Sequence, residues 1–200
     1  MLILARHGQT DANAHGLLQG RSDLALNKVG MEQAQALGEF LRARYGSSIG
    51  RLYCSPLRRA VETAEIIARS IGCEPVVDER LIEVSYGQWE GVPFKDVPGS
   101  AANAWRTDAT FSPRDGESLE QVSQRVAPLL SEWLGGTPVV AVSHVSPIKA
   151  LLTNALGMSP VSSWRFRLDN AAMSVIEGTA AWPVVSGFNV VPLPQASLDG

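Results

Sequence analysis

The sequence predicts an α/β fold of three layers, α/β/α, with a mostly parallel central sheet. Short apolar runs alternate along the chain with segments whose apolar residues recur at helical spacing, a pattern typical of parallel sheets covered by helices on both faces. The run 139–142 is continuously apolar, as expected of a central strand buried on both sides. Residues 84–116 break the alternation with glycines, prolines and tryptophans, which predicts a small insertion over the functional site.

The first half of the chain contains three predicted strands, at residues 2–5, 51–54 and 75–77. From Gly30 to Tyr45 apolar residues recur at helical spacing, which predicts the first long helix. Ser55 and Pro56 follow the second strand. They predict the start of another helix, with the serine as N-cap and the proline in the first helical position.

The second half of the chain continues the same pattern. Ser118 and Gln121 form a capping-box pattern at the start of a helix. Pro128 is expected to kink or split that helix, because proline cannot donate the backbone hydrogen bond of a helix interior. Ser146 and Pro147 predict a further helix after the strand 139–142. Two closing strands are expected, with an antiparallel arrangement as one option for them, at residues 173–176 and 188–191.

Composition limits the classes of function. The chain has 200 residues, 45% hydrophobic and 18% charged, with a net charge of -3. We expect one domain over residues 1–200, with no nucleic-acid or membrane partner. The first ten residues hold too short an apolar run for a signal peptide, and no stretch reaches a membrane-spanning length. We therefore expect a cytoplasmic protein.

Polar side chains follow three of the predicted strands at the point where each strand ends. Arg6 and His7 come directly after the first strand, Arg58 and Arg59 follow the second, and His144 follows the strand 139–142. In open α/β sheets, ligands bind at the carboxyl edge of the strands. Two of the three histidines of the chain are therefore expected at the ligand-binding edge.

These residue types suit a phosphorylated ligand. Arginine presents a planar fork of donors that matches phosphate oxygens and stays charged at any working pH. A neutral imidazole can attack phosphorus, and an acid must then protonate the leaving oxygen. The two cysteines, Cys54 and Cys73, form no metal or disulfide motif, and Cys54 is expected to be a buried structural thiol. No spacing of possible ligands resembles a metal site, so we expect neither metal nor cofactor.

The motifs of the chain resemble those of the histidine phosphatase superfamily, which includes cofactor-dependent phosphoglycerate mutases. The resemblance rests on the order and spacing of several motifs between residues 2 and 176, because an Arg-His-Gly signature alone would be weak evidence. The motifs are Leu4–Thr10, Asn13 with Gln19–Gly20, Ser55–Ala60 with Glu62–Ala64, Leu81–Gly91, Gly116–Ser118 and Val142–His144.

The resemblance implies a role for each matching residue. His7 would be the nucleophile that becomes phosphorylated, and Arg6 and Arg59 would clamp the phosphoryl oxygens. His144 would stabilise the transition state, and Glu83 would protonate the leaving oxygen and then help to activate water. The substrate-binding residues implied are Arg6, Asn13, Gln19, Gly20, Arg59, Glu83, His144 and Val145.

Some positions leave alternatives open. Val145 stands where the family usually has glycine, and its side chain is expected to narrow the pocket. Arg58 fits a surface or substrate-rim position better than the clamp, because the family arginine directly precedes the alanine, here Ala60. Glu83 has a structural alternative as an ion-pair partner of Arg80. Trp89 and Trp105 fit packing better than substrate stacking. Asn27 is expected to replace a family threonine as a helix cap.

The sequence therefore predicts a metal-independent phosphatase that hydrolyses a small phosphomonoester metabolite through a phosphohistidine. Phosphoglycerate mutase is the first alternative, although the modest insertion and short C-terminal end favour a phosphatase. A non-catalytic phosphate-ligand binder is the second. The candidate substrates include α-ribazole phosphate, glucosyl-3-phosphoglycerate and phosphoserine, and the motifs do not choose among them. A monomer or a homodimer is expected.

Overall fold

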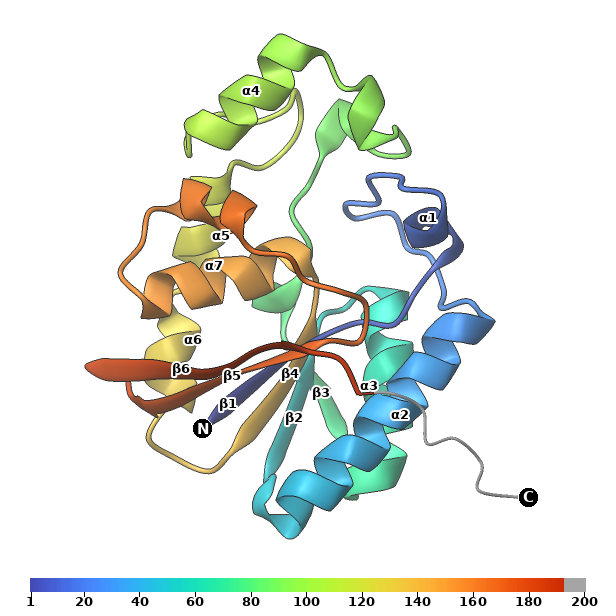
Figure 1. Ribbon diagram of the computed structural model, residues 1–200, viewed down its shortest axis with the longest axis vertical. Helices are drawn as coiled ribbons and strands as arrows, with labels where there is room; N and C mark the ends of the chain where they lie inside the picture. The colour runs from blue at the N-terminus through green and yellow to red at the C-terminus, as the bar shows by residue number, and fades with distance from the viewer. Residues whose placement is uncertain (193–200) are drawn as a thin grey trace.

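A six-stranded sheet forms the centre of the computed structural model, which describes residues 1–192 (Figure 1). The strand order is β3-β2-β4-β1-β5-β6. The strands are β1 (Leu2–Arg6), β2 (Arg51–Cys54), β3 (Pro75–Val77), β4 (Val139–Ser143), β5 (Met173–Thr179) and β6 (Trp182–Val190). The first four run parallel and the last two pair antiparallel. The predicted fold class is confirmed, and β6 is longer than expected because it begins at Trp182.

Seven α-helices and five 3₁₀ helices connect and cover the strands within residues 1–192. The α-helices are α1 (Asp11–Ala14), α2 (Lys28–Tyr45), α3 (Arg58–Ile71), α4 (Gly99–Thr107), α5 (Leu119–Val126), α6 (Pro128–Trp133) and α7 (Val145–Ala155). The 3₁₀ helices are η1 (Gly46–Ser48), η2 (Glu79–Leu81), η3 (Gly87–Trp89), η4 (Phe94–Asp96) and η5 (Pro160–Arg165). None of these helices combines the length and the apolarity needed to cross a bilayer.

Both faces of the sheet are covered, and successive residues of the inner strands serve opposite faces. In β1, Ile3 packs into the same core as Leu37 of α2, whereas Leu4 packs into the core that contains Leu151 of α7. Helices α2 and α3 lie on the first face, and α5, α6 and α7 lie on the second (Figure 1). Every residue of β4 is buried, as the apolar run predicts. A strand that is buried on both faces is apolar almost throughout, because neither set of its alternating side chains faces water.

The helix starts predicted at Asn27 and Ser118 and the break predicted at Pro128 are confirmed. Asn27 caps α2 by accepting a hydrogen bond from the Gly30 amide, and Ser118 with Gln121 forms the capping box of α5. The helix predicted beyond Ser118 splits, because α5 ends at Val126 and α6 begins at Pro128.

The assignment of Ser55 as a helix cap is wrong. Helix α3 begins at Arg58, its N-cap is Leu57, and no side chain caps it. The Ser55 hydroxyl is occupied elsewhere, since it lies 2.7 Å from His144 Nε2.

Residues 84–116 form η3, η4 and α4, which lie beyond the carboxyl end of the sheet (Figure 1). Their aromatic side chains hold this region together. Trp89 and Trp105 are both buried, with ring centroids 5.4 Å apart, and Trp89 also stacks on Phe111. Packing is therefore the observed role of Trp89, whereas Trp105 also lines a cavity.

The loop after β1 is packed tightly against the first turn of α2. A Cβ atom on Gly30 would lie 2.1 Å from the Gln9 carbonyl oxygen, and one on Gly8 would lie 2.2 Å from the Gly30 carbonyl oxygen. Both obstacles are backbone atoms, which cannot rotate away. Because they lack a Cβ atom, the two glycines allow the backbone of α2 to pack directly against the backbone of the loop that follows β1.

We predict that Gly30→Ala lowers stability by about 1–3 kcal/mol, the usual cost of overpacking. The melting temperature should fall by about 2–4 °C for each kcal/mol in a domain of this size. The matched control is Gly136→Ala, because no atom lies within 4 Å of a Cβ at that position. Equal melting temperatures for the two variants, measured by calorimetry, would contradict the tight contact.

Candidate active site

The parallel pairing of β1 with β4 brings two histidines side by side. Arg6 pairs with Ser143 at the ends of the strands, and the His7 amide donates a 3.0 Å hydrogen bond to the Ser143 carbonyl. The next residue of each strand is a histidine. The ring centroids of His7 and His144 lie 5.0 Å apart, so the predicted pair is assembled by strand register.

His7 is held as a neutral imidazole with a defined tautomer. Its Nδ1 lies 2.7 Å from the Gly8 carbonyl oxygen, which can only accept, so Nδ1 carries the hydrogen. The lone pair is then on Nε2. Burial lowers the pKa of His7 well below its usual value, and the charges of Arg6 and Arg59 lower it further. A neutral Nε2 is the form of histidine that can act as a nucleophile.

His144 is completely buried beside His7 and is oriented by Ser55. Its Nε2 lies 2.7 Å from Ser55 Oγ, and the Leu57 amide donates to that same oxygen. Within residues 1–192 the Ser55 hydroxyl hydrogen has no other acceptor than His144 Nε2, which places the ring hydrogen on Nδ1. Burial lowers the pKa of His144, and Arg59 and His7 reinforce this. His144 Nδ1 has no protein partner.

The two arginines are each anchored by part of the guanidinium group. Arg59 donates from Nη1 to the Ser22 carbonyl and from Nη2 to the Gly20 carbonyl, both at 2.7 Å. Arg6 donates from Nη1 to the Leu168 carbonyl at 2.7 Å. The Nε atoms of both arginines are buried without a hydrogen-bond partner. Because buried donors are normally paired, these atoms indicate a site for a ligand that accepts hydrogen bonds.

Glu83 is buried at the same edge of the sheet, and one of its oxygens is fixed by backbone donors. The Val84 amide donates to Oε1 at 2.8 Å, and the Ser146 amide at the start of α7 donates to the same oxygen at 3.1 Å. The predicted alternative, an ion pair with Arg80, is wrong. Arg80 binds Asp78 and Glu132 instead.

These residues surround a cavity of about 170 Å³, here called the basic cavity. Eight of its lining residues are predicted site residues, namely Arg6, His7, Asn13, Gln19, Gly20, Arg59, Glu83 and Val145. Three others were not predicted, namely Leu17, Leu18 and Tyr86. His144, which is fully buried beside His7, is not among the lining residues. No sequence signal marks the two leucines, whereas Tyr86 stands within the motif that contains Glu83.

Asn13 and Gln19 each have an amide nitrogen to offer a ligand. The Asn13 Oδ1 accepts from the Asn170 side chain and from the Thr10 amide, and Gln19 Oε1 accepts from the Thr10 hydroxyl. Their oxygens are thus engaged by the protein. The Asn13 and Gln19 side chains can therefore present NH₂ donors to the basic cavity.

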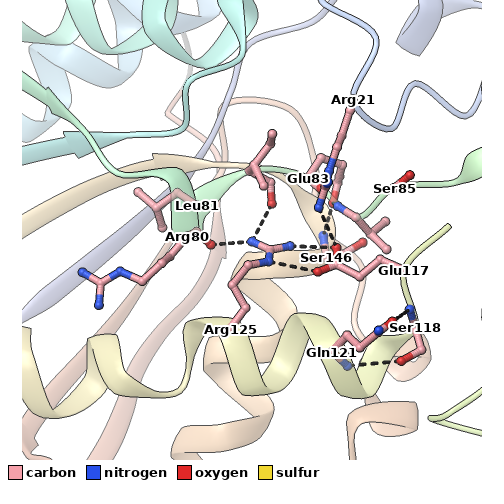
Figure 2. Close-up of polar contacts among 12 residues, drawn as sticks. Arg21, Arg80, Leu81, Glu83, Ser85, Glu117, Ser118, Gln121, Arg125 and Ser146 are labelled. Carbon is pink, nitrogen blue, oxygen red and sulfur yellow. Dashed lines mark hydrogen bonds and ion pairs between the residues drawn. The ribbon is translucent and has the colours of Figure 1, made fainter.

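The segment that carries Glu83 is held from below by Arg125 and Glu117 (Figure 2). Arg125 donates from Nη1 to the carbonyls of Arg80 and Ile82, and its Nε and Nη2 donate to the two carboxylate oxygens of Glu117 at 3.0 and 2.9 Å. Glu117 also pairs with Arg21, whose Nε donates to the Glu83 carbonyl. Sequence reasoning did not identify Arg125 or this role of Arg21.

Other predicted residues lie outside the basic cavity. Arg58 is exposed and pairs with Glu62 one turn along α3. Cys54 is buried, and burial raises the pKa of its thiol to about 11, as expected of an inert structural thiol. The part of the chain that the structure describes contains no group of three or more His, Cys, Asp or Glu residues arranged to hold a metal ion.

Comparison with known proteins identifies similar chains. Residues 2–191 match the model of the histidine phosphatase superfamily, branch 1. The bifunctional protein Rv2228c of Mycobacterium tuberculosis is 37% identical over 88% of this chain and 50% of its own length. The chain thus spans about half the length of the first curated relatives that it matches.

Two further relatives match over most of both chains. The glucosyl-3-phosphoglycerate phosphatase of Mycobacterium tuberculosis is 38% identical over 93% of this chain and 85% of its own length. The crystal structure of a phosphoserine phosphatase variant from Entamoeba histolytica, in complex with phosphoserine, superimposes with a TM-score of 0.86. It is 29% identical, and the match covers 95% of this chain and 96% of that chain.

We predict that Arg125→Gln destabilises the protein by about 3 kcal/mol. The change leaves two carbonyls without their donor, and the largely buried Glu117 carboxylate keeps only its 3.3 Å contact with Arg21. Arg80→Gln is the control, since its ion pairs are more exposed and should contribute about 1 kcal/mol or less. Urea unfolding of both variants measures the difference. Equal losses would mean that Arg125 acts as an ordinary surface charge.

We also predict that stability falls as the solution becomes more acidic. In the unfolded chain His7 and His144 have pKa values near about 6.5, whereas burial lowers both pKa values in the folded chain. Below about pH 6.5 the unfolded state therefore binds protons that the folded state does not. The free energy of unfolding should fall by up to about 1.4 kcal/mol per pH unit for each histidine.

Urea titrations between about pH 8 and pH 5 measure this slope. His144→Gln should reduce the slope, whereas His15→Gln, which removes an exposed side chain, should leave it as in the wild type. The prediction fails if His144→Gln has the wild-type slope.

Proposed function

Because this chain belongs to the histidine phosphatase superfamily, branch 1, we propose that it hydrolyses a small phosphomonoester through a phosphohistidine on His7. The main support is the set of unpaired donors at one site. Arg6 Nε, Arg59 Nε and His144 Nδ1 are buried without partners beside a neutral His7. A phosphoryl group supplies the oxygen acceptors that these donors need.

In the first step, His7 Nε2 attacks the phosphorus atom while the bond to the ester oxygen breaks. The Gly8 carbonyl holds the Nδ1 hydrogen throughout and orients the ring. Arg6, Arg59 and His144 donate to the phosphoryl oxygens as negative charge develops on them. The positive charges of Arg6 and Arg59 also serve in place of a metal ion, so the proposed reaction needs no added cation.

Glu83 supplies the proton that the leaving oxygen takes up. Two amides already donate to Oε1, so Oε2 is the oxygen that carries the proton. In the second step the Glu83 carboxylate accepts a proton from water as that water attacks phosphorus and the N–P bond breaks. The products are the alcohol and inorganic phosphate, and both His7 and Glu83 return to their starting forms.

The substrate is proposed to be a small phosphorylated metabolite. The basic cavity holds about 170 Å³, which suits a phosphoryl group but not a large ester. Two of the relatives named above are phosphatases, one of glucosyl-3-phosphoglycerate and one of phosphoserine. Both of these substrates are phosphomonoesters of small hydroxy compounds.

The proposal is tested with an aryl phosphate in the presence of EDTA. The wild type should release alcohol and inorganic phosphate in equal amounts, and quenching in base should trap an acid-labile phosphoenzyme. His7→Ala should lose turnover almost completely and form no phosphoenzyme, with the fold intact by circular dichroism. Phosphorylation of His7→Ala, or a need for Mg²⁺ or Zn²⁺, would contradict the proposal.

We predict that Glu83→Gln reduces kcat/KM far more for glycerol phosphate than for p-nitrophenyl phosphate. An alkoxide is a poor leaving group and needs a proton in the transition state, whereas nitrophenolate leaves without one. The difference should be on the order of 10²–10⁴-fold. Comparing kcat/KM excludes the dephosphorylation step, which Glu83 also serves. Equal losses on both substrates would indicate that Glu83 only positions the substrate.

A further inference from the structure

A second cavity, here called the aromatic cavity, adjoins the basic cavity. It holds about 150 Å³, and its lining includes four aromatic side chains, those of Tyr86, Phe94, Trp105 and Trp164, together with Lys149 of α7. Phe94 and Trp105 come from the predicted insertion, and Trp164 comes from η5. Val145 is the one residue of this described lining that the sequence predicts as a site residue.

The two cavities share part of their lining. Leu18, Tyr86 and Val145 line both of them. A phosphoryl group in the basic cavity therefore leaves the rest of its ester directed along these three side chains. The aromatic cavity is the adjoining space in which the leaving group can lie.

The indole rings at the wall are fixed in place. Trp164 Nε1 donates to the Trp105 carbonyl at 3.1 Å, and the two rings meet edge to face at 81° with centroids 5.5 Å apart. Tyr86 also meets Trp105 edge to face, at 5.1 Å. Rings held in this way present a preformed apolar surface, which suits a small ring of a ligand and costs little ordering entropy on binding.

Two donors among the residues that line the aromatic cavity are unpaired within residues 1–192, whereas the Tyr86 hydroxyl pairs with Ser146. Within residues 1–192, Lys149 makes no ion pair and no side-chain hydrogen bond, and Trp105 Nε1 is buried without a partner. No Asp or Glu among the described residues lines this cavity. Burial raises the pKa of Tyr86, so its phenol stays neutral. An anionic group on the ligand would supply the missing partner of Lys149.

We propose that the aromatic cavity holds the leaving group, and that Lys149 selects phosphomonoesters whose leaving group joins a small ring to a carboxylate. The proposal rests on the proposed phosphatase function and names the substrate class of that same site. In this assignment Lys149 is a specificity residue that binds the far end of the substrate. The phosphoryl transfer itself stays with the residues of the basic cavity.

The preference for a carboxylated substrate should depend on pH, because it requires Lys149 to be protonated. The pKa of Lys149 is lowered to about 8, mainly by burial. The nearby Glu83 opposes this shift and Arg6 adds to it. The fraction of free enzyme that carries the ammonium charge therefore falls as the pH rises through about 8. Preference for a carboxylated substrate, measured as a ratio of kcat/KM values, should fall over the same range.

The test compares three ring substrates: phenyl phosphate, para-carboxyphenyl phosphate and para-carbamoylphenyl phosphate. The carbamoyl group matches the carboxylate in shape and lacks its charge. For each substrate the ratio of wild-type kcat/KM to that of Lys149→Met cancels the intrinsic leaving ability. This ratio should be about 10- to 100-fold for the carboxylate, the usual effect of losing a hydrogen bond to a charged group. It should stay near 1 for the two neutral rings.

Lys149→Arg should restore the preference and should keep it above about pH 8, because guanidinium stays charged. Trp164→Leu should weaken hydrolysis of all three ring substrates relative to ethyl phosphate. Equal losses for Lys149→Met on the carboxylated and neutral rings would overturn the proposal. The same holds if the preference of the wild type does not change with pH.

Turnover and binding measurements distinguish a wrong reaction from a wrong substrate class. If the wild type hydrolyses none of the phosphates, the phosphatase function is wrong, and binding then decides the inference. The carboxylated ring should raise the melting temperature of the wild type more than the carbamoyl ring does, and Lys149→Met should abolish that difference. Equal shifts for the two rings would overturn the inference as well.

Discussion

The pairing of β1 with β4 is the contact on which the rest of the site depends. The two strands run parallel and in step from Leu2 opposite Val139 to Arg6 opposite Ser143. The residues that follow them, His7 and His144, therefore leave the sheet at one level. A slip by one residue would turn each side chain to the opposite face, and the two rings would no longer meet. The apolar alternation of both strands between two cores holds this register.

The buried positive charge at this edge of the sheet favours a bound anion. Two guanidinium groups and two imidazoles converge, with Glu83 as the one carboxylate that lines the basic cavity. Burial keeps both histidines neutral, which limits the positive charge to the arginines. An oxyanion would satisfy the free donors and compensate the desolvated charge. The Arg125–Glu117 pair keeps Glu83 in place beneath this cluster (Figure 2).

The two cavities divide the recognition of an ester between different parts of the chain. The basic cavity is built mainly from residues that follow the strands, whose positions the sheet determines. The aromatic cavity is built from η4, α4, η5 and α7, which meet above the sheet. Within residues 1–192, η4, α4 and η5 contribute no residue to the basic cavity, so they can change with less effect on the groups proposed to react than α7, whose Ser146 amide binds Glu83.

The sequence by itself determined most of the strands and long helices and their order, because burial periodicity and capping are local properties. The run 139–142 identified the central strand, Ser118 and Gln121 identified a helix start, and the residues after the strands identified most of the groups that we propose to react. It did not predict α1 or α4, or that β6 begins at Trp182. Tertiary structure decided what those residues touch. Ser55 matches a helix cap in sequence, yet it binds His144, which lies 89 positions away along the chain. Arg125 and Lys149 carry no local signal, since their functions arise only where α5 and α7 pack beside the segment that contains Glu83 and Tyr86.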